Sequence, residues 1–292
     1  MSRHIAFITD PLPQLDLNSD TVALIQNAQA HGNQVFWMES SDLHIKHGTP
    51  VGFMASITSQ SGSGAPFVLG ESFLANLDRF DAIFWRKASP YSPEDQFALD
   101  VLQLASSTTR IFNNPVTLRS TNEHIFALQF PNFVPQTLVT KSTKAINAFV
   151  REVGGRAFVR KLHSPASSNI MLQQGSPDLK AICGLLTDSG KHYAYAQSFI
   201  DPMNQKRLYF VNGECLGTTS VEGAQGPGIT PQDGGLMNAV GAALRERGLL
   251  LATVDVADGK IVDLNLSCPE GFAKLNRFEQ EDIFARIFAA LG

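Results

Sequence analysis

The 292-residue chain has few cysteines and no long hydrophobic run. Its three cysteines, Cys183, Cys215 and Cys268, are scattered and form no CxxC pair, which argues against a disulfide framework and against a zinc site. They indicate reduced thiols, so we expect a cytoplasmic protein. No stretch of about 18 apolar residues occurs, and a transmembrane helix is therefore not expected.

Positive charge is also scarce. The 23 Lys and Arg residues face 27 Asp and Glu residues, a net charge of −4, which argues against nucleic-acid binding and against attachment to an anionic membrane surface. A hydrophobic content of 43% suits a globular protein with a substantial core and two or three domains. Arg3 and His4 lead directly into a strand pattern, which is not typical of a secretory signal.

The first third of the chain alternates short strands with helices, which predicts a mostly parallel βαβ sheet in a domain at 1–118. Asp20 is the expected N-cap of the first helix, and the Ser/Gly-rich segment Ser56–Gly64 is expected to be a loop. The predicted strands are His4–Thr9, Gln34–Met38, Ala82–Trp85 and Arg110–Phe112, and the predicted helices are Thr21–Ala30 and Pro93–Ala105.

From Ser120 the pattern changes to that of a small α+β lid domain at 119–200, followed by a C-terminal domain at 201–292. The lid is expected to hold a short helix through Phe126, strands Thr137–Val139, Ala157–Lys161 and Asn169–Gln173, helices Ser142–Val153 and Leu179–Thr187, and a strand ending at Gln197. The last domain is expected to hold strands Arg207–Val211 and Cys215–Ser220, helix Gln232–Arg247, an acidic hairpin and an amphipathic helix, Glu279–Leu291.

Three oxygen-bearing side chains lie on the acidic hairpin, whose strands are joined by Asp258-Gly259. Asp255 precedes this turn, while Asp263 and Asn265 follow it and share one face of a strand. Hard cations such as Mg²⁺ prefer these ligands, so nucleotide chemistry is the first hypothesis. A two-residue turn pairs Asp255 with Val262 on the opposite face, so this hypothesis predicts a three-residue loop or a bulge. The alternative is a polar, exposed hairpin.

Short motifs, individually weak but fairly specific in order and spacing, run nearly the whole length of the chain. Together they make it resemble the prokaryotic glutathione synthetase family. The motifs are Asp10-Pro11, Asp20-Thr21, Met38-Glu39, Trp85-Arg86-Lys87, Asn114-Pro115, Leu118-Arg119, Asn122-Glu123, Pro135 with Thr137-Leu138-Val139-Thr140, Ala196-Gln197, Lys206-Arg207, Asn212-Gly213-Glu214, Asp255, Asp263-Leu264-Asn265 and Ser267-Cys268-Pro269.

The resemblance implies an α/β ATP-grasp fold and an ATP-dependent carboxylate–amine ligase. In that family ATP phosphorylates the carboxylate of γ-glutamylcysteine, glycine displaces the phosphate, and Mg²⁺ holds the phosphate groups. The implied substrate is small or peptide-like, and a homo-oligomer is expected. The implied site residues are Asp255, Asp263 and Asn265 for the metal, His124, Arg160, Lys161, Gln197 and Arg207 for the nucleotide, and Arg86, Asn265 and Ser267 for the substrate.

The chain differs from the family at positions that bind the phosphates and the substrate. His124 and Arg160 stand where the family has lysines, and Asp263 where it usually has glutamate. Residues 162–168 contain no glycine but do contain Pro165, although a glycine-rich phosphate loop is expected there. No Lys or Arg occurs at 215–244, where the family has a basic substrate loop.

Several side chains carry two interpretations. Arg86 fits either a substrate carboxylate or a surface salt bridge, Gln197 fits either adenine or solvent, and Cys268 is better explained as a small buried residue than as a nucleophile. Two functions therefore remain open. The chain is either an active ligase with a changed substrate, or a degenerate relative that serves as a regulatory or ligand-binding module.

Overall fold

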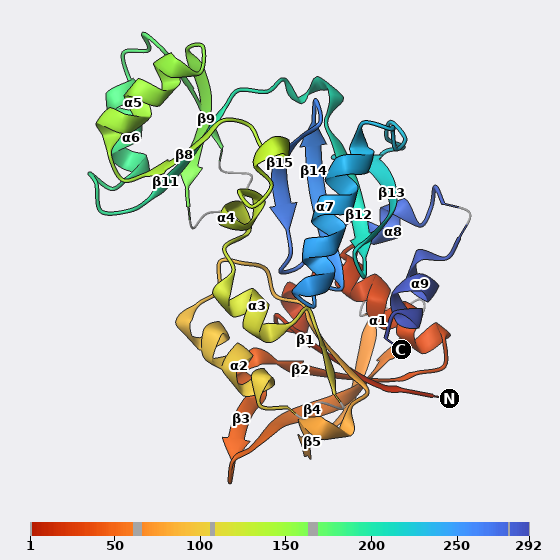
Figure 1. Cartoon of the computed structure of the whole chain (residues 1–292). Coiled ribbons are helices and arrows are strands. Elements are labelled where there is room, and N and C mark those ends of the chain that lie inside the picture. The colour runs from red at the N-terminus through yellow and green to blue at the C-terminus, as the bar shows by residue number, and fades with distance from the viewer. Residues whose placement is uncertain (1, 61–65, 106–108, 163–168, 280, 292) are drawn as a thin grey trace. The chain divides into compact units, whose positions relative to one another are not determined.

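The computed structural model describes residues 2–60, 66–105, 109–162, 169–279 and 281–291, which form two compact units (Figure 1). Unit 1 comprises residues 1–121, 207–253 and 265–292, and unit 2 comprises 122–206 and 254–264. Most of the predicted phosphate-loop segment, residues 163–168, lies outside the described residues. The division into three domains stays a prediction.

Unit 1 is built on a sheet whose central part is parallel, as the βαβ rhythm predicted. Its parallel strands follow the order β2-β1-β6-β7. Ile5 and Phe7 pack with helix α1, while Ala6 alternates to the other face and is equally buried, so both faces are covered. The elements are β1 (His4–Thr9), α1 (Asp20–Ala30), β2 (Gln34–Glu39), β6 (Ala82–Trp85), α2 (Pro93–Gln103), β7 (Arg110–Phe112) and α3 (Pro115–Ser120).

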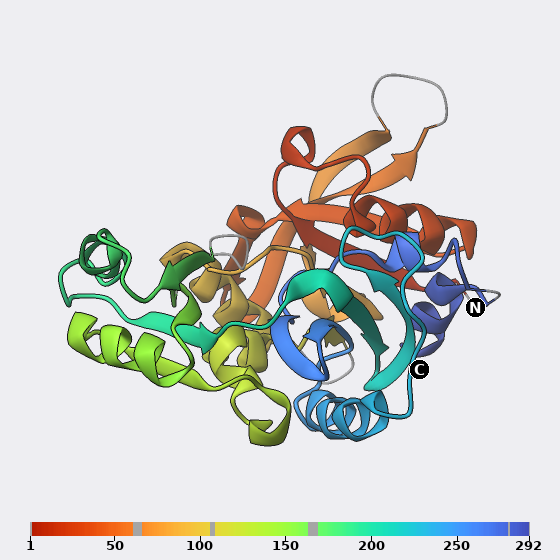
Figure 2. The same cartoon turned by 90° about the horizontal axis from the view of Figure 1, so that it is seen from above.

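An antiparallel extension of this sheet was not predicted. Strands β3 (Leu43–Lys46), β4 (Thr49–Ser59) and β5 (Phe67–Asn76) pair antiparallel beyond β2, and β4 and β5 run side by side in Figure 2. The expected loop at 56–64 is therefore wrong up to Ser59, and residues 61–65 lie outside the described part. These strands contain many small and polar residues, since a half-exposed strand needs few apolar side chains, and their sequence pattern is therefore weak.

Asp20 does not cap its own helix. The N-cap of α1 is Ser19, whose side chain accepts a hydrogen bond from the Val22 amide. The Asp20 carboxylate instead accepts from the Phe272 and Ala273 amides, at 2.6 and 2.8 Å, at the start of helix α8 (Phe272–Leu275). The acidic residue thus caps a helix more than 250 positions away.

Unit 2 contains a four-stranded antiparallel sheet in the order β10-β9-β11-β8. Helices α5 and α6 lie beside one another on one face of it (Figure 1), where Ile146, Phe149 and Cys183 share a core with Val159. Ser142, where the predicted helix begins, is the N-cap of α5. The elements are α4 (Glu123–Ala127), β8 (Thr137–Thr140), α5 (Thr143–Glu152), β9 (Arg156–Lys161), β10 (Ile170–Gln173), α6 (Leu179–Leu186) and β11 (Ala194–Ser198).

The remaining strands form a sheet in the order β13-β12-β14-β15, and β14 passes from unit 1 into unit 2 after Thr253. The last helix, α9, starts at Ile283 rather than at Glu279, because Asp282 caps it. Its predicted apolar stripe is buried, as expected. The elements are β12 (Lys206–Val211), β13 (Glu214–Ser220), α7 (Asp233–Glu246), β14 (Leu251–Ala257), β15 (Lys260–Asn265) and α9 (Ile283–Ala289).

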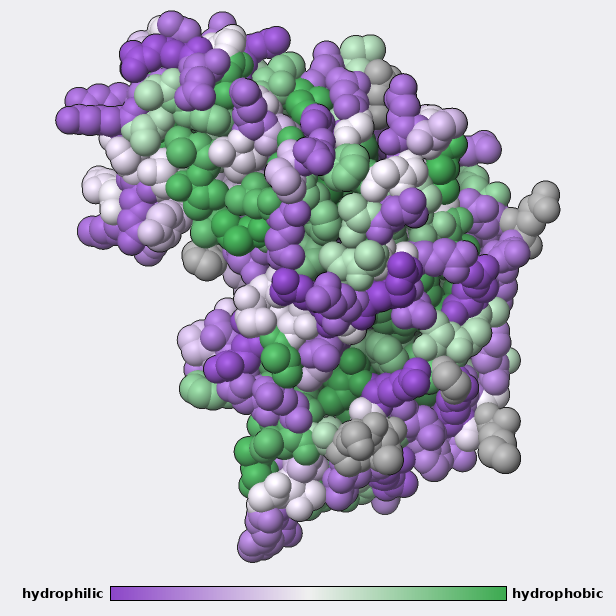
Figure 3. All heavy atoms as spheres, in the orientation of Figure 1, coloured by the Kyte–Doolittle hydropathy of each residue, from purple (hydrophilic) through white to green (hydrophobic). Residues whose placement is uncertain are grey.

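Hydrophilic residues cover much of the face drawn in Figure 3, with hydrophobic groups between them. Among the described residues, none of the helices combines the length and the apolar character needed to cross a membrane.

Asn113 stabilises unit 1 from a buried position after β7. Its Nδ2 donates to the carbonyl oxygens of Leu251 and Leu266 at 2.7 and 2.6 Å, and its Oδ1 accepts from the Leu251 amide at 3.0 Å. Replacing it leaves these buried backbone groups without their partner, which costs more than the bonds alone.

We therefore expect Asn113→Ala to lower the free energy of unfolding by about 3 kcal/mol. Urea titration followed by tryptophan fluorescence measures this in unit 1, since Trp37 and Trp85 both lie there. The exposed Asn18→Ala is the control, with an expected change within about 0.5 kcal/mol. A loss below about 1 kcal/mol for Asn113→Ala would contradict this account.

Candidate functional site

The acidic hairpin has a two-residue turn, so the expected odd-length loop is wrong. Strand β14 ends at Ala257 and β15 starts at Lys260. Asp258 and Gly259 have φ values of 47° and 72°, which are the positive angles of the tight turns that suit twisted hairpins. Asp and Gly tolerate this conformation better than most residues, so local backbone preference decided the loop length.

Asp263 lies against a buried arginine of unit 2. Arg160, on β9, is only 2% exposed, and its Nη1 is 3.5 Å from Asp263 Oδ1. This distance is that of an ion pair and is longer than a good hydrogen bond. Within the described residues, Arg160 Nε and Nη1 and Asp263 Oδ1 are buried without a hydrogen-bond partner. Such orphaned groups are expected where an absent ligand completes the site.

The electrostatics of this cluster are unbalanced. Burial raises the pKa of Asp263 to about 7, Arg160 acts in the opposite direction, and the negative charges of Asp255 and Glu123 raise it further. The carboxylates of Asp255 and Asp263 therefore influence one another despite the two-residue turn. A positive ion beside them would favour the ionised form of Asp263, because it relieves both repulsion and desolvation.

Two of the predicted phosphate-binding residues contact the same aromatic ring. The Arg160 guanidinium carbon lies 5.2 Å from the Tyr195 ring centroid, and the His124 ring lies 5.4 Å from it. Asn122 positions His124, since its Oδ1 accepts from the His124 amide. Burial raises the pKa of Tyr195 to about 12, so it stays neutral. Sequence reasoning missed Tyr195, although it pairs directly with Arg160 across β11 and β9.

Lys161 and Gln197, also predicted to bind the nucleotide, differ in exposure. Lys161 is exposed, because consecutive strand residues face opposite sides and Arg160 points inward. Gln197 is buried, and its Nε2 donates to Thr137 Oγ1 at 3.3 Å. The alternative that Gln197 is merely solvated is therefore wrong, and its contact with a nucleotide base remains a prediction.

Arg86 is buried in unit 1. It forms a salt bridge, but not on the surface, where the alternative interpretation of the sequence placed it. Its Nη2 lies 2.5 Å from Glu270 Oε1 and 3.1 Å from the Pro269 carbonyl oxygen, and its Nε donates to Thr21 Oγ1 at 3.0 Å. Burial raises the pKa of Glu270, and Arg86 counteracts this. Glu270 was missed because it lies 184 positions from its partner.

The other predicted substrate residues lie near this pair in the sequence and in unit 1. Ser267 Oγ accepts from the Ser89 amide at 3.1 Å, and Asn265 Oδ1 accepts from the Cys268 amide at 3.1 Å. Arg207 donates to the Glu270 carbonyl oxygen at 3.5 Å. Unit 1 thus holds Arg86, Arg207, Asn265 and Ser267, and unit 2 holds the others.

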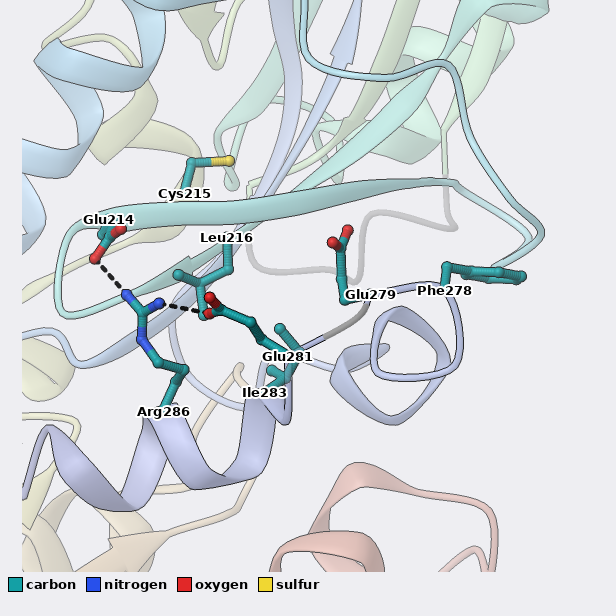
Figure 4. Close-up of a pocket in the computed structure, with 8 residues that line it drawn as sticks. All are labelled: Glu214, Cys215, Leu216, Phe278, Glu279, Glu281, Ile283 and Arg286. Carbon is teal, nitrogen blue, oxygen red and sulfur yellow. Dashed lines mark hydrogen bonds and ion pairs between the residues drawn. The ribbon is translucent and has the colours of Figure 1, made fainter.

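An open pocket of about 510 Å³ lies on unit 1 (Figure 4). Arg286 points between Glu214 and Glu281, with nitrogen–oxygen distances of 2.7 and 2.9 Å. The Arg286 guanidinium is therefore paired with these two carboxylates. The pocket contains none of the predicted site residues, and its other lining residues are Cys215, Leu216, Phe278, Glu279 and Ile283.

The folds of the two units and the grouping of carboxylates with buried cations define a protein of the ATP-grasp ligase class. The N-terminal-domain model of prokaryotic glutathione synthetase matches residues 4–119, and the ATP-grasp-domain model of the same enzyme matches residues 123–280. The chain belongs to the prokaryotic glutathione synthetase family.

Known relatives agree over nearly the full length. The glutathione synthetase of Shewanella oneidensis is 29% identical, covering 98% of this chain and 97% of the relative. That of Synechococcus elongatus is 30% identical, with 98% and 97% coverage. Among solved structures, a RimK domain ATP-grasp protein from Sphaerobacter thermophilus has a TM-score of 0.65 at 17% identity, covering 99% of both chains.

The ATP-grasp ligase PsnB, solved with its precursor peptide PsnA2 and AMPPNP, has a TM-score of 0.64 at 15% identity, covering 99% of this chain and 97% of PsnB. At these identities the two solved structures show the shared fold alone. The fold predicted from the sequence motifs is therefore confirmed.

Cys268 is expected to react slowly in the folded protein. Burial raises the pKa of its thiol to about 11, and its Sγ lies 3.7 Å from Glu270 Oε1. At pH 8 the reactive thiolate is then about one part in a thousand. Iodoacetamide at pH 8, followed by peptide mass mapping, should label Cys268 at least tenfold more slowly in the native than in the urea-denatured protein. Equal rates in the two states would contradict the assignment.

Proposed function

We propose that the protein is an ATP-dependent carboxylate–amine ligase acting on a small peptide-like acid. The γ-phosphoryl group passes to a substrate carboxylate, giving ADP and an acyl phosphate. An amine nitrogen then attacks the acyl carbon, the carbon–oxygen bond to phosphate breaks, and an amide and inorganic phosphate leave. Membership of the glutathione synthetase family supports this reaction.

One observation carries the proposal at the level of residues. Within the described part of the chain, Arg160 Nε and Nη1 are buried without a hydrogen-bond partner, and Asp263 Oδ1, 3.5 Å from Nη1, accepts no hydrogen bond. Unpaired donors fit phosphate oxygens, and an unpaired carboxylate oxygen fits a divalent cation, so the residues present suit both groups. When bound, ATP with Mg²⁺ supplies the phosphoryl group and neutralises its charge.

Each residue then has a separate task. Arg160 would hold phosphate oxygens, with His124 beside it on the Tyr195 ring. Asp263 would hold the cation, with Asp255, whose charge acts on it despite the two-residue turn. The metal role of Asn265 stays a prediction. The Asp263 side chain is one methylene shorter than the glutamate that the family usually has there, so it would reach less far toward a cation.

A changed substrate follows from the distribution of charge. Residues 215–244 contain no Lys or Arg, so the basic loop that would stabilise an acyl phosphate is absent from this segment. Arg86, the candidate for binding a substrate carboxylate, already pairs with Glu270. The acceptor and the acid therefore need different contacts from those of γ-glutamylcysteine and glycine.

The ion pair of Arg160 with Asp263 favours a second candidate function. The two opposite charges balance one another without a bound nucleotide, as expected of a degenerate relative that binds ligands or regulates a partner without making glutathione. A ligase would release ADP in the presence of its substrates, whereas this second candidate would not.

Nucleotide binding is the first measurement. ATP with Mg²⁺ at a hundred times its Kd should stabilise the native protein by about 2.7 kcal/mol, visible as a rise in Tm. ADP release is then assayed with γ-glutamylcysteine and glycine and with a panel of other acids and amines. We expect turnover with a member of the panel. Stabilisation without any turnover would support the degenerate alternative, and no stabilisation by ATP would contradict the ligase.

The metal role of the hairpin is tested by Asp255→Asn. Loss of one anionic ligand should lower ADP release by at least a hundredfold, about 2.7 kcal/mol, and raise the Mg²⁺ concentration needed for half-maximal rate. Asp258→Asn changes the same charge at the exposed turn, where Asn also tolerates positive φ, and should leave the rate unchanged. Equal effects of the two substitutions would argue against Asp255 as a ligand.

A further inference from the structure

Arg160 lies where a metal ion would approach Asp263. Its Nη1 is 3.5 Å from Asp263 Oδ1, while Mg²⁺ binds carboxylate oxygens at about 2.0–2.1 Å. Two cations on one carboxylate oxygen repel each other strongly in a buried setting. The observed position of the guanidinium and a metal ion on Asp263 Oδ1 are therefore alternatives.

The surroundings hold Arg160 in that position. Tyr195 pairs with it across β9 and β11, and the Tyr195 ring lies 5.2 Å from its guanidinium carbon, a distance at which cation and ring attract. The space among Glu123, His124, Arg160, Tyr195 and Asp263 has no room for a water molecule. A hydrated ion cannot enter it without moving a side chain.

Phosphate groups offer Arg160 another acceptor. Its Nε and Nη1 have no hydrogen-bond partner in the described part of the chain, and guanidinium groups bind phosphate oxygens through two parallel hydrogen bonds. Hydrogen bonds to nucleotide phosphates can therefore replace the ion pair that Arg160 makes with Asp263. A metal ion alone accepts no hydrogen bond from Arg160 and repels its positive charge.

We infer that Arg160 is an internal counter-ion that keeps divalent cations off Asp263 until nucleotide phosphates draw its guanidinium away. Metal then binds with the nucleotide or after it, and free Mg²⁺ does not occupy the site. This inference rests on the proposed function for the identity of the ligand. The exclusion of metal by Arg160 depends on the ion pair alone.

Mn²⁺ without nucleotide is the decisive probe, with the full chain and with bound ion counted from the loss of the free-Mn²⁺ signal in electron paramagnetic resonance. The wild type should show no saturable binding up to millimolar Mn²⁺. Arg160→Gln should bind one Mn²⁺ with a Kd at least tenfold lower. The double variant Arg160→Gln with Asp263→Asn should lose that gain, which locates the ion at Asp263.

Two controls separate position from charge. Arg151→Gln removes the same charge from an exposed site on α5 and should bind Mn²⁺ as weakly as the wild type. Arg160→Lys keeps a cation at the site and should stay within threefold of the wild type. Circular dichroism checks folding, and Arg160→Met serves as a second neutral variant if Arg160→Gln does not fold.

The second arm adds ADP, with Mn²⁺ bound by ADP alone subtracted. Saturating ADP should lower the Kd of the wild type for Mn²⁺ at least tenfold, and should have less effect on Arg160→Gln. Tight Mn²⁺ binding by the wild type without nucleotide, or no gain in either neutral variant, would overturn the inference. If the proposed ligase activity is wrong, no turnover will be seen in the ADP-release assay. The Mn²⁺ binding measured without nucleotide does not depend on that result.

Discussion

Charges that are buried must find opposite charges, and this constraint organises both units of the protein. Moving an ion out of water is expensive, and a pair of ions recovers that cost only when geometry and further hydrogen bonds are good. Unit 1 meets this condition at Arg86, whose guanidinium has Glu270, the Pro269 carbonyl and Thr21 around it. Unit 2 meets it incompletely at Arg160, which is also buried but whose Nε and Nη1 have no hydrogen-bond partner within the described ranges.

The difference between these two arginines distinguishes a structural position from a binding position. Arg86 is bound through Nε and Nη2 by groups of its own unit, so a ligand would have to compete with them. Arg160 has an ion pair and an aromatic face, but its Nε and Nη1 find no hydrogen-bond acceptor among the residues that the structure describes. Buried donors without hydrogen-bond partners suit an anionic ligand, which supports the proposed nucleotide role of unit 2.

Local patterns predicted much of the fold. Strands β1 and β6, the Ser142 cap of α5 and the apolar stripe of α9 follow from periodicity and capping, which act within a few residues. Strands β4 and β5 did not follow, because their Gly and Ser residues are typical of loops. Contacts between distant segments were also beyond reach: nothing near Arg86 in the sequence indicates Glu270, and nothing near Asp20 indicates that it caps α8.

The contacts of unit 1 also constrain how the chain is made. Arg3 Nη1 donates to the Phe288 carbonyl oxygen at 2.8 Å, and Asp20 caps a helix that starts at Phe272. During synthesis, β1 and α1 leave the ribosome long before these partners exist. Their apolar faces must stay uncovered, or be shielded by a chaperone, until residues near Phe288 emerge. Most of unit 2, which is continuous from 122 to 206, is translated within that interval.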